Sequence, residues 1–163
     1  MAQIALTAMM LTGPATDTQQ LDTLRQSAVE YALNFRGVPY SWGGDDAEGG
    51  FDCSGLVIEV LKSVGAFPRK MDETANSLYQ RYSAHTVTTP YLGCLVFWGR
   101  STERIRHVEI AISPWQSVGA SGGGSKTKTR QDAVEQNAFV KTRPIYSGRG
   151  AAPVAIVDPM QEI

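Results

Sequence analysis

The chain has 163 residues, of which 42% are hydrophobic and 19% are charged, and its formal net charge is −1. This composition excludes an intrinsically disordered chain and fits a globular protein with a hydrophobic core. The near-neutral charge argues against nucleic acid as a partner, because it leaves no broad basic face for phosphates.

Residues 1–16 are predicted to form an N-terminal tail ahead of a single domain at residues 17–163. The stretch Met1–Leu11 is apolar, like the hydrophobic part of a signal peptide, but no Lys or Arg precedes it. A signal, a tail and an edge strand all remain open for this stretch, and so does the route of export. No segment reaches the roughly 20 apolar residues that span a bilayer, so stable membrane insertion is not expected.

The first half of the chain carries apolar residues at helical spacing, and the second half carries short apolar or alternating runs between turn residues. Helices followed by antiparallel strands are typical of the α+β class. Helices are predicted at about 17–36, 53–63 and 70–82, with helical turns at 129–136. Strands are predicted at 93–99, 106–113, 116–121, 139–146 and 154–157.

Cys53 is predicted to lie in the first turn of its helix, because Asp52 is a good N-cap residue and an apolar helical pattern follows. Free backbone N–H groups and the helix dipole favour a thiolate at such a position. A thiolate is a nucleophile, so Cys53 is a candidate catalytic residue. The structural alternative is a small, inert core cysteine.

Cysteine and histidine usage gives little support for other roles. The chain has two cysteines and two histidines, without the spacing of a metal site or a disulfide framework. No metal ion and no cofactor are expected.

A base for Cys53 is available in the predicted strand at 106–113. His107 alternates there with apolar residues and shares its strand face with Glu109. A histidine in this place can take the thiol proton and form an ion pair with the thiolate. The other histidine, His85, sits in a polar run and is expected at the surface.

Four blocks of the sequence resemble the NlpC/p60 cysteine peptidases, which are cell-wall hydrolases. Their order and spacing agree over roughly residues 21–121. The blocks are Pro39-Tyr40-x-Trp42-Gly43-Gly44, Gly50-Phe51-Asp52-Cys53-Ser54-Gly55-Leu56-Val57, Gly93-x-Leu95-Val96-Phe97-Trp98 and Arg106-His107-Val108-x-Ile110.

The resemblance implies a papain-like α+β fold in which the nucleophile helix packs on a central antiparallel sheet. It implies that residues 17–163 form one catalytic domain acting at the cell wall. The implied reaction is cleavage of an amide bond in the peptide stem of peptidoglycan, commonly between D-γ-glutamyl and a diamino acid.

The resemblance also implies roles for individual residues. Cys53 is then the nucleophile and His107 the base, and the Tyr40 hydroxyl helps to hold the oxyanion. Asp52 and Ser54 match positions that contact the stem peptide near its free amine and carboxylates.

Two departures from the family pattern stand out. The family usually has a third polar residue about twelve positions after the base, where this chain has Gly119. Glu109, Ser117, Ser121, Gln116 or a backbone carbonyl could accept the Nδ1 proton of the histidine instead. The second departure is Cys94, which replaces a usual Asp and is expected to pack at a strand end.

The segment 117–145 resembles family members found among phage and prophage proteins, which implies a tail-associated wall peptidase or an endolysin. A phage tail assembly is therefore one expected partner. Two alternatives to a hydrolase stay open. One is an inactive wall-binding relative, because of Gly119, and the other is an acyltransferase or esterase with the same Cys–His pair.

Overall fold

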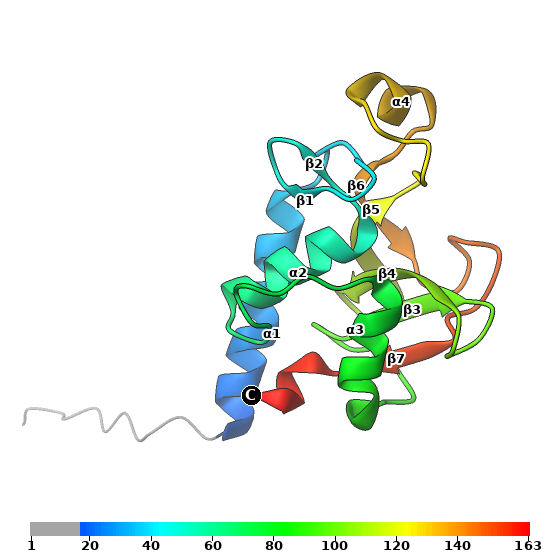
Figure 1. Cartoon of the computed structure of the whole chain (residues 1–163). Helices are drawn as coiled ribbons and strands as arrows, with labels where there is room; N and C mark the ends of the chain where they lie inside the picture. Colours follow the sequence, from blue (N-terminus) through cyan, green and yellow to red (C-terminus); the bar gives the residue numbers. More distant parts are fainter. Residues whose placement is uncertain (1–16) are drawn as a thin grey trace, which may run out of the picture.

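The computed structural model describes residues 17–163, so the predicted tail at 1–16 lies outside the described residues. The fold is α+β, as predicted, with helices mostly first and a sheet after them (Figure 1). The helices are α1 (Asp17–Asn34), α2 (Cys53–Ser63), α3 (Ala75–Tyr82) and α4 (Arg130–Glu135), with 3-10 turns η1 (Ser83–His85) and η2 (Pro159–Glu162). None of these helices is long and apolar enough to cross a membrane.

The main sheet has five antiparallel strands in the order β6-β5-β4-β3-β7. All five were predicted to within two residues at each end. The strands are β3 (Leu95–Gly99), β4 (Ile105–Ala111), β5 (Gln116–Ser121), β6 (Phe139–Pro144) and β7 (Ala155–Val157). A small hairpin of β1 (Asp45–Asp46) and β2 (Gly50–Phe51) was not predicted, because two-residue strands carry no periodicity.

The predicted helix at 70–82 starts too early. Thr74 caps α3 with extended backbone, and its side chain accepts a hydrogen bond from the backbone N–H of Ser77. Capping at Thr74 fixes the helix start at Ala75, five residues later than the pattern suggested.

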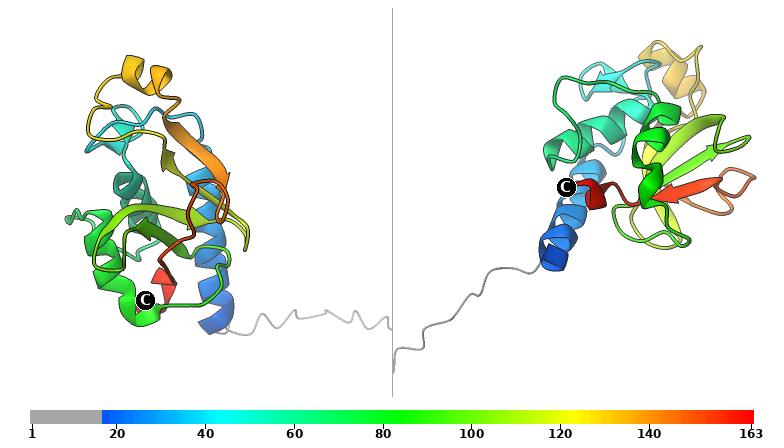
Figure 2. Two further views of the ribbon diagram at one scale, coloured as in Figure 1. Left: turned by 90° about the vertical axis from the view of Figure 1, so that its right-hand side faces the viewer. Right: turned by 60° about the horizontal axis from the view of Figure 1, so that its bottom comes forward.

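One face of the sheet packs on α1, α2 and α3, and the buried apolar side chains between them form the main core (Figure 1). On the other face lies a smaller buried cluster, closed by the connection between β6 and β7 at residues 145–154. Figures 1 and 2 place this connection on the side of the sheet away from α1. Cys94 packs in this cluster, as predicted for a strand-end residue, and both cysteines are free.

Asp158, just before η2, links the end of the described chain to α1, which lies beside η2 (Figure 2). Its fully buried carboxylate accepts from Arg25 at 2.5 Å and from the hydroxyl of Tyr91 at 2.7 Å. This buried ion pair fixes α1 against the last turn of the chain.

Candidate active site

The helix start predicted at Cys53 is confirmed, since Cys53 is the first residue of α2. Oδ1 of Asp52 accepts from the backbone N–H of Gly55 at 2.8 Å, and Oδ2 accepts from that of Gly43 at 3.0 Å. Asp52 therefore caps the helix and ties the glycine-rich loop to it. A Cβ on Gly55 would lie 2.0 Å from the carbonyl oxygen of Gly44, so the loop packs directly on the first turn.

A cavity of about 700 Å³ lies at this helix start, between α2, β4 and the loop at 122–125. The structure brings all the predicted site residues to its wall. They are Tyr40, Asp52, Cys53, Ser54 and His107. His85 does not line this cavity, and its Nε2 bonds to Glu162 at 2.9 Å.

Cys53 faces the backbone of β4 beside His107. Within the described chain, β4 pairs with β5 only near the C-terminal end of β4, so the two strands diverge toward the cavity. The backbone N–H of Val108 favours the ionised form of the Cys53 thiol. The sulfur therefore lies next to the residue that follows His107 along the chain.

The surroundings of Cys53 oppose the thiolate that the sequence predicts. Burial raises the pKa of the Cys53 thiol to about 11, and the negative charge of Asp52 acts in the same direction. The backbone hydrogen bonds from Val108 and Ser54 favour the thiolate but do not overcome burial. Burial also lowers the pKa of His107 below 6.5. Burial of the two side chains thus favours a thiol and a neutral imidazole, and it opposes the ion pair that the sequence predicts.

His107 is held through Nε2, which lies 2.9 Å from Oε1 of Glu109. The expectation that an orienting group would engage Nδ1 was therefore wrong. The side chain of His107 is only 14% exposed and lies beside the ring of Trp98. Glu109 therefore engages Nε2 of the imidazole.

Tyr40 forms part of the cavity wall and is 4% exposed. Burial raises the pKa of its phenol well above the ordinary value of 10. The hydroxyl therefore keeps its proton at neutral pH and is available as a hydrogen-bond donor.

A family model of the NlpC/P60 family matches residues 37–144. The chain belongs to the NlpC/P60 family. Its resemblance to that family, inferred from four sequence blocks, is confirmed.

Named relatives support the same assignment. The chain is 31% identical over 101 residues to the bifunctional muramidase/DL-endopeptidase CwlT of Bacillus subtilis, covering 61% of this chain and 30% of CwlT. The NlpC/p60 domain of the peptidoglycan hydrolase SagA superposes with a TM-score of 0.58 at 29% identity, covering 82% of this chain and 97% of that domain. The chain spans less than half the length of the curated relatives it matches.

The family fold also occurs without catalysis. RipD of Mycobacterium tuberculosis, described as a non-catalytic NlpC/p60 domain protein adapted to peptidoglycan binding, superposes with a TM-score of 0.58 at 21% identity. The superposed region covers 82% of this chain and 95% of RipD. This likeness concerns the fold alone.

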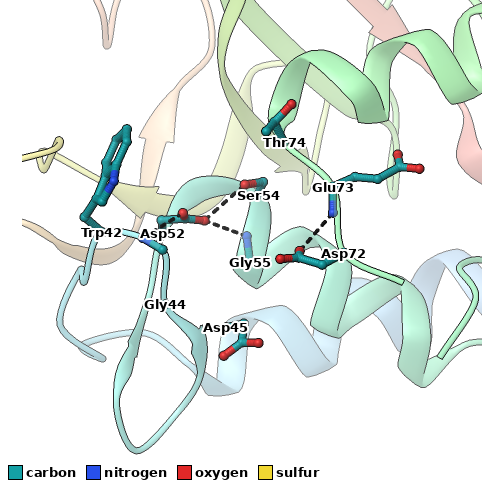
Figure 3. A pocket seen from close by; sticks show the side chains of 10 residues that line it. Trp42, Gly44, Asp45, Asp52, Ser54, Gly55, Asp72, Glu73 and Thr74 are labelled. Carbon is teal, nitrogen blue, oxygen red and sulfur yellow. Dashed lines mark hydrogen bonds between the residues drawn. The ribbon is translucent and has the colours of Figure 1, made fainter. Parts of the chain in front are cut away.

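A smaller hollow of about 300 Å³ adjoins the cavity of this NlpC/P60 domain (Figure 3). The two share Trp42, Asp52, Ser54 and Thr74 in their walls. The hollow is acidic, and no Lys, Arg or His lines it in the described part of the chain. Its acidic residues are Asp45, Asp52, Asp72 and Glu73, and the carboxylate of Glu73 is paired with Arg81. No group of acidic, Cys or His side chains within residues 17–163 is arranged to hold a metal ion.

Sequence reasoning missed Arg149, which lies beyond the residues that match the family model. Its Nη2 lies 2.6 Å from Oε1 of Glu109 and 2.5 Å from Oγ of Ser121. A single arginine in a glycine-rich loop carries no signal of such a role in the sequence, because the contact joins residues 40 positions apart.

Proposed function

We propose that this NlpC/P60 protein is a cysteine peptidase that hydrolyses an amide bond in the peptide stem of peptidoglycan. The observation that carries the proposal is that Cys53 and His107 line one cavity, with the imidazole held through Nε2. The names of CwlT as a DL-endopeptidase and SagA as a peptidoglycan hydrolase support a wall peptide as substrate. Action at the cell wall follows from that substrate.

In the acylation step, Nδ1 of His107 takes the thiol proton as the sulfur of Cys53 bonds to the scissile carbonyl carbon. The carbonyl oxygen takes up negative charge and accepts a hydrogen bond from the Tyr40 hydroxyl. The imidazolium then gives its proton to the amine nitrogen as the C–N bond breaks. A thioester on Cys53 remains.

Hydrolysis of the thioester reverses these roles. Nδ1 of His107 takes a proton from a water molecule, whose oxygen attacks the thioester carbon. The C–S bond breaks, the sulfur recovers its proton from the imidazolium, and the carboxylic acid product leaves.

For the bond itself, we infer cleavage between D-γ-glutamyl and a diamino acid. The acidic hollow next to the cavity suits an ammonium group (Figure 3). The free amine of a stem peptide supplies such a group a short distance from the γ-glutamyl bond. Asp52 and Ser54 border both spaces and are the proposed contacts between them.

Mass spectrometry of muropeptides tests this function directly. Purified peptidoglycan digested by the wild-type chain is expected to yield fragments with a new glutamyl carboxylate and a new diamino-acid amine. Cys53→Ala is expected to release none. If wild type and Cys53→Ala give the same fragments, the hydrolase proposal fails.

A non-catalytic wall-binding role is the second candidate, favoured by Gly119 and by the example of RipD. It predicts that the chain sediments with insoluble peptidoglycan and releases no fragments. An acyltransferase or esterase would instead consume an acyl ester and leave stem peptides uncut. Association with a phage tail remains a prediction of the sequence resemblance.

A further inference from the structure

The partner of His107 comes from the histidine's own strand. His107 and Glu109 lie two residues apart on one face of β4, and Oε1 of Glu109 lies 2.9 Å from Nε2. The Glu109 side chain is fully buried, so this carboxylate has a fixed place. It is therefore built into the strand that carries the base.

The space for Glu109 exists because residue 119, on the neighbouring strand β5, is glycine. A Cβ at Gly119 would lie 2.4 Å from Cγ, 2.9 Å from Cδ and 3.0 Å from Cβ of Glu109. Any other residue at 119 would require the Glu109 side chain to move. The need for glycine here is spatial, since Gly119 has no left-handed backbone conformation.

Arg149 holds the same carboxylate from the connection between β6 and β7. Its guanidinium lies over the ring of Trp98, 5.1 Å from the ring centroid. Nη2 has two hydrogens, and Oε1 of Glu109 and Oγ of Ser121 lie within 2.6 Å of it. Nη2 also lies 2.5 Å from Nε2 of His107, so three atoms compete for its two hydrogens.

This arrangement bears on the tautomer of the imidazole. If the two oxygens take both Nη2 hydrogens, Nε2 of His107 keeps its own hydrogen and donates it to Glu109. Ser117 donates to Oε2 at 2.5 Å, so each oxygen of Glu109 has a donor. Burial opposes ionisation, yet the hydrogen bonds from His107 and Ser117 and the charge of Arg149 lower the pKa of Glu109 to about 2.

We propose that Glu109 is the positioning residue for His107, in space left by Gly119, and that Arg149 fixes its carboxylate. The expected effect on catalysis rests on the proposed function, whereas the expected tautomer of His107 does not. The pair holds the Nε2–H tautomer and leaves Nδ1 unprotonated toward Cys53. Arg149 lies outside residues 37–144, so its contact with Glu109 involves a residue beyond the family match.

Nitrogen-15 NMR of histidine-labelled protein tests the tautomer without a substrate. The chain has two histidines, so His85, which pairs with Glu162, serves as an internal reference. At pH 8 the wild type is expected to show His107 as the Nε2–H form. Glu109→Ala and the shape-preserving Glu109→Gln are expected to populate the Nδ1–H form as well. An unchanged His107 spectrum in both folded variants overturns the proposal.

Arg149→Ala is compared with Arg130→Ala, which alters an exposed residue of α4. Arg149→Ala is expected to populate the Nδ1–H form of His107, whereas Arg130→Ala leaves the spectrum unchanged. If both variants match the wild type, Arg149 does not fix the carboxylate and that part of the inference fails.

Kinetic measurements then test whether a carboxylate at position 119 can replace the one at position 109. Glu109→Ala is expected to lower kcat by about 10²- to 10⁴-fold with little change in KM, because a base in the wrong tautomer cannot accept the thiol proton. Adding Gly119→Asp to Glu109→Ala places a carboxylate in the vacated space and is expected to recover at least about tenfold of that loss. Gly119→Asp alone is expected to be impaired, and wild-type activity in it would contradict the claim about space. If the wild type cleaves no substrate, the NMR result still decides the positioning role.

Discussion

Gly123 lies against the ring of Tyr40, such that a Cβ at position 123 would come within 2.3 Å of Cδ1 of that ring. The ring is buried and has little room to retreat. Replacing Gly123 by Ala is therefore expected to displace the proposed oxyanion donor and to lower kcat by about 10- to 100-fold.

Gly124→Ala is the matched control for this prediction. A Cβ at Gly124 meets nothing within 4 Å, so this variant is expected to keep wild-type kcat. Steady-state rates on a defined stem peptide compare the two. Equal rates for both variants would show that the contact with Tyr40 does not matter.

The pH dependence of kcat/KM is expected to have its acid limb below pH 6.5. Nδ1 of His107 must be unprotonated to act as base, and burial lowers the pKa of His107 below 6.5. Activity is then gained as pH rises through that lowered pKa and is expected to stay flat across the neutral range. An acid limb centred above pH 7 would contradict the neutral imidazole.

Alkylation by iodoacetamide reports the state of Cys53 directly. Burial raises the pKa of both Cys53 and Cys94 to about 11, so both rates are expected to rise about tenfold per pH unit between pH 7 and 9. Cys53 is expected to react faster because it lines the cavity, whereas Cys94 has no exposed surface. A Cys53 rate that is already at its plateau at pH 7 would instead indicate an ion pair with His107.

Arg25→Ala is expected to destabilise the fold by about 3–5 kcal/mol, because it leaves Asp158 charged and buried without its cation. Asp22 is the other partner of Arg25, and the side chain of Asp22 is 68% exposed. Asp22→Ala is therefore expected to destabilise the fold by less than about 1 kcal/mol. Urea denaturation of both variants measures the difference. Similar losses in the two would show that burial of the Arg25–Asp158 pair has no special weight.

Acid is expected to destabilise the protein partly through Glu109. The pKa of this carboxyl is 4.5 when unperturbed and about 2 in the fold, so its ionisation contributes stability above pH 4.5. That stability is lost as the pH falls from 4.5 toward 2. The lowered pKa of His107 acts in the same sense, since protonation below pH 6.5 favours the unfolded chain.

The measurement is the unfolding free energy of wild type and Glu109→Gln at several pH values. The gap between the two proteins is expected to narrow as the pH falls from 5 to 3. A constant gap would mean that Glu109 is not held as a carboxylate in the fold.

The local part of the site could be predicted from the sequence. The start of α2 depends on Asp52 and on the apolar residues that follow, all of which are neighbours in the chain. The strand carrying His107 follows from alternation, which also predicts that Glu109 shares its face. These features are set by contacts a few residues apart.

The ionisation state of the site could not be predicted in this way. The helix terminus favours a thiolate at Cys53, but burial among elements distant in sequence outweighs it. Gly119 marked a missing side chain without showing what fills its place. Only the packing of β5 on β4 reveals that Glu109 does.

Carrying the base and its carboxylate on one strand has an evolutionary consequence. A chain that acquires a side chain at position 119 first must displace Glu109, and a chain that loses Glu109 first leaves the imidazole without its acceptor. Either order of the two substitutions is therefore expected to produce an impaired protein at its first step. Descendants of this protein should keep Gly119 and Glu109 together or replace both.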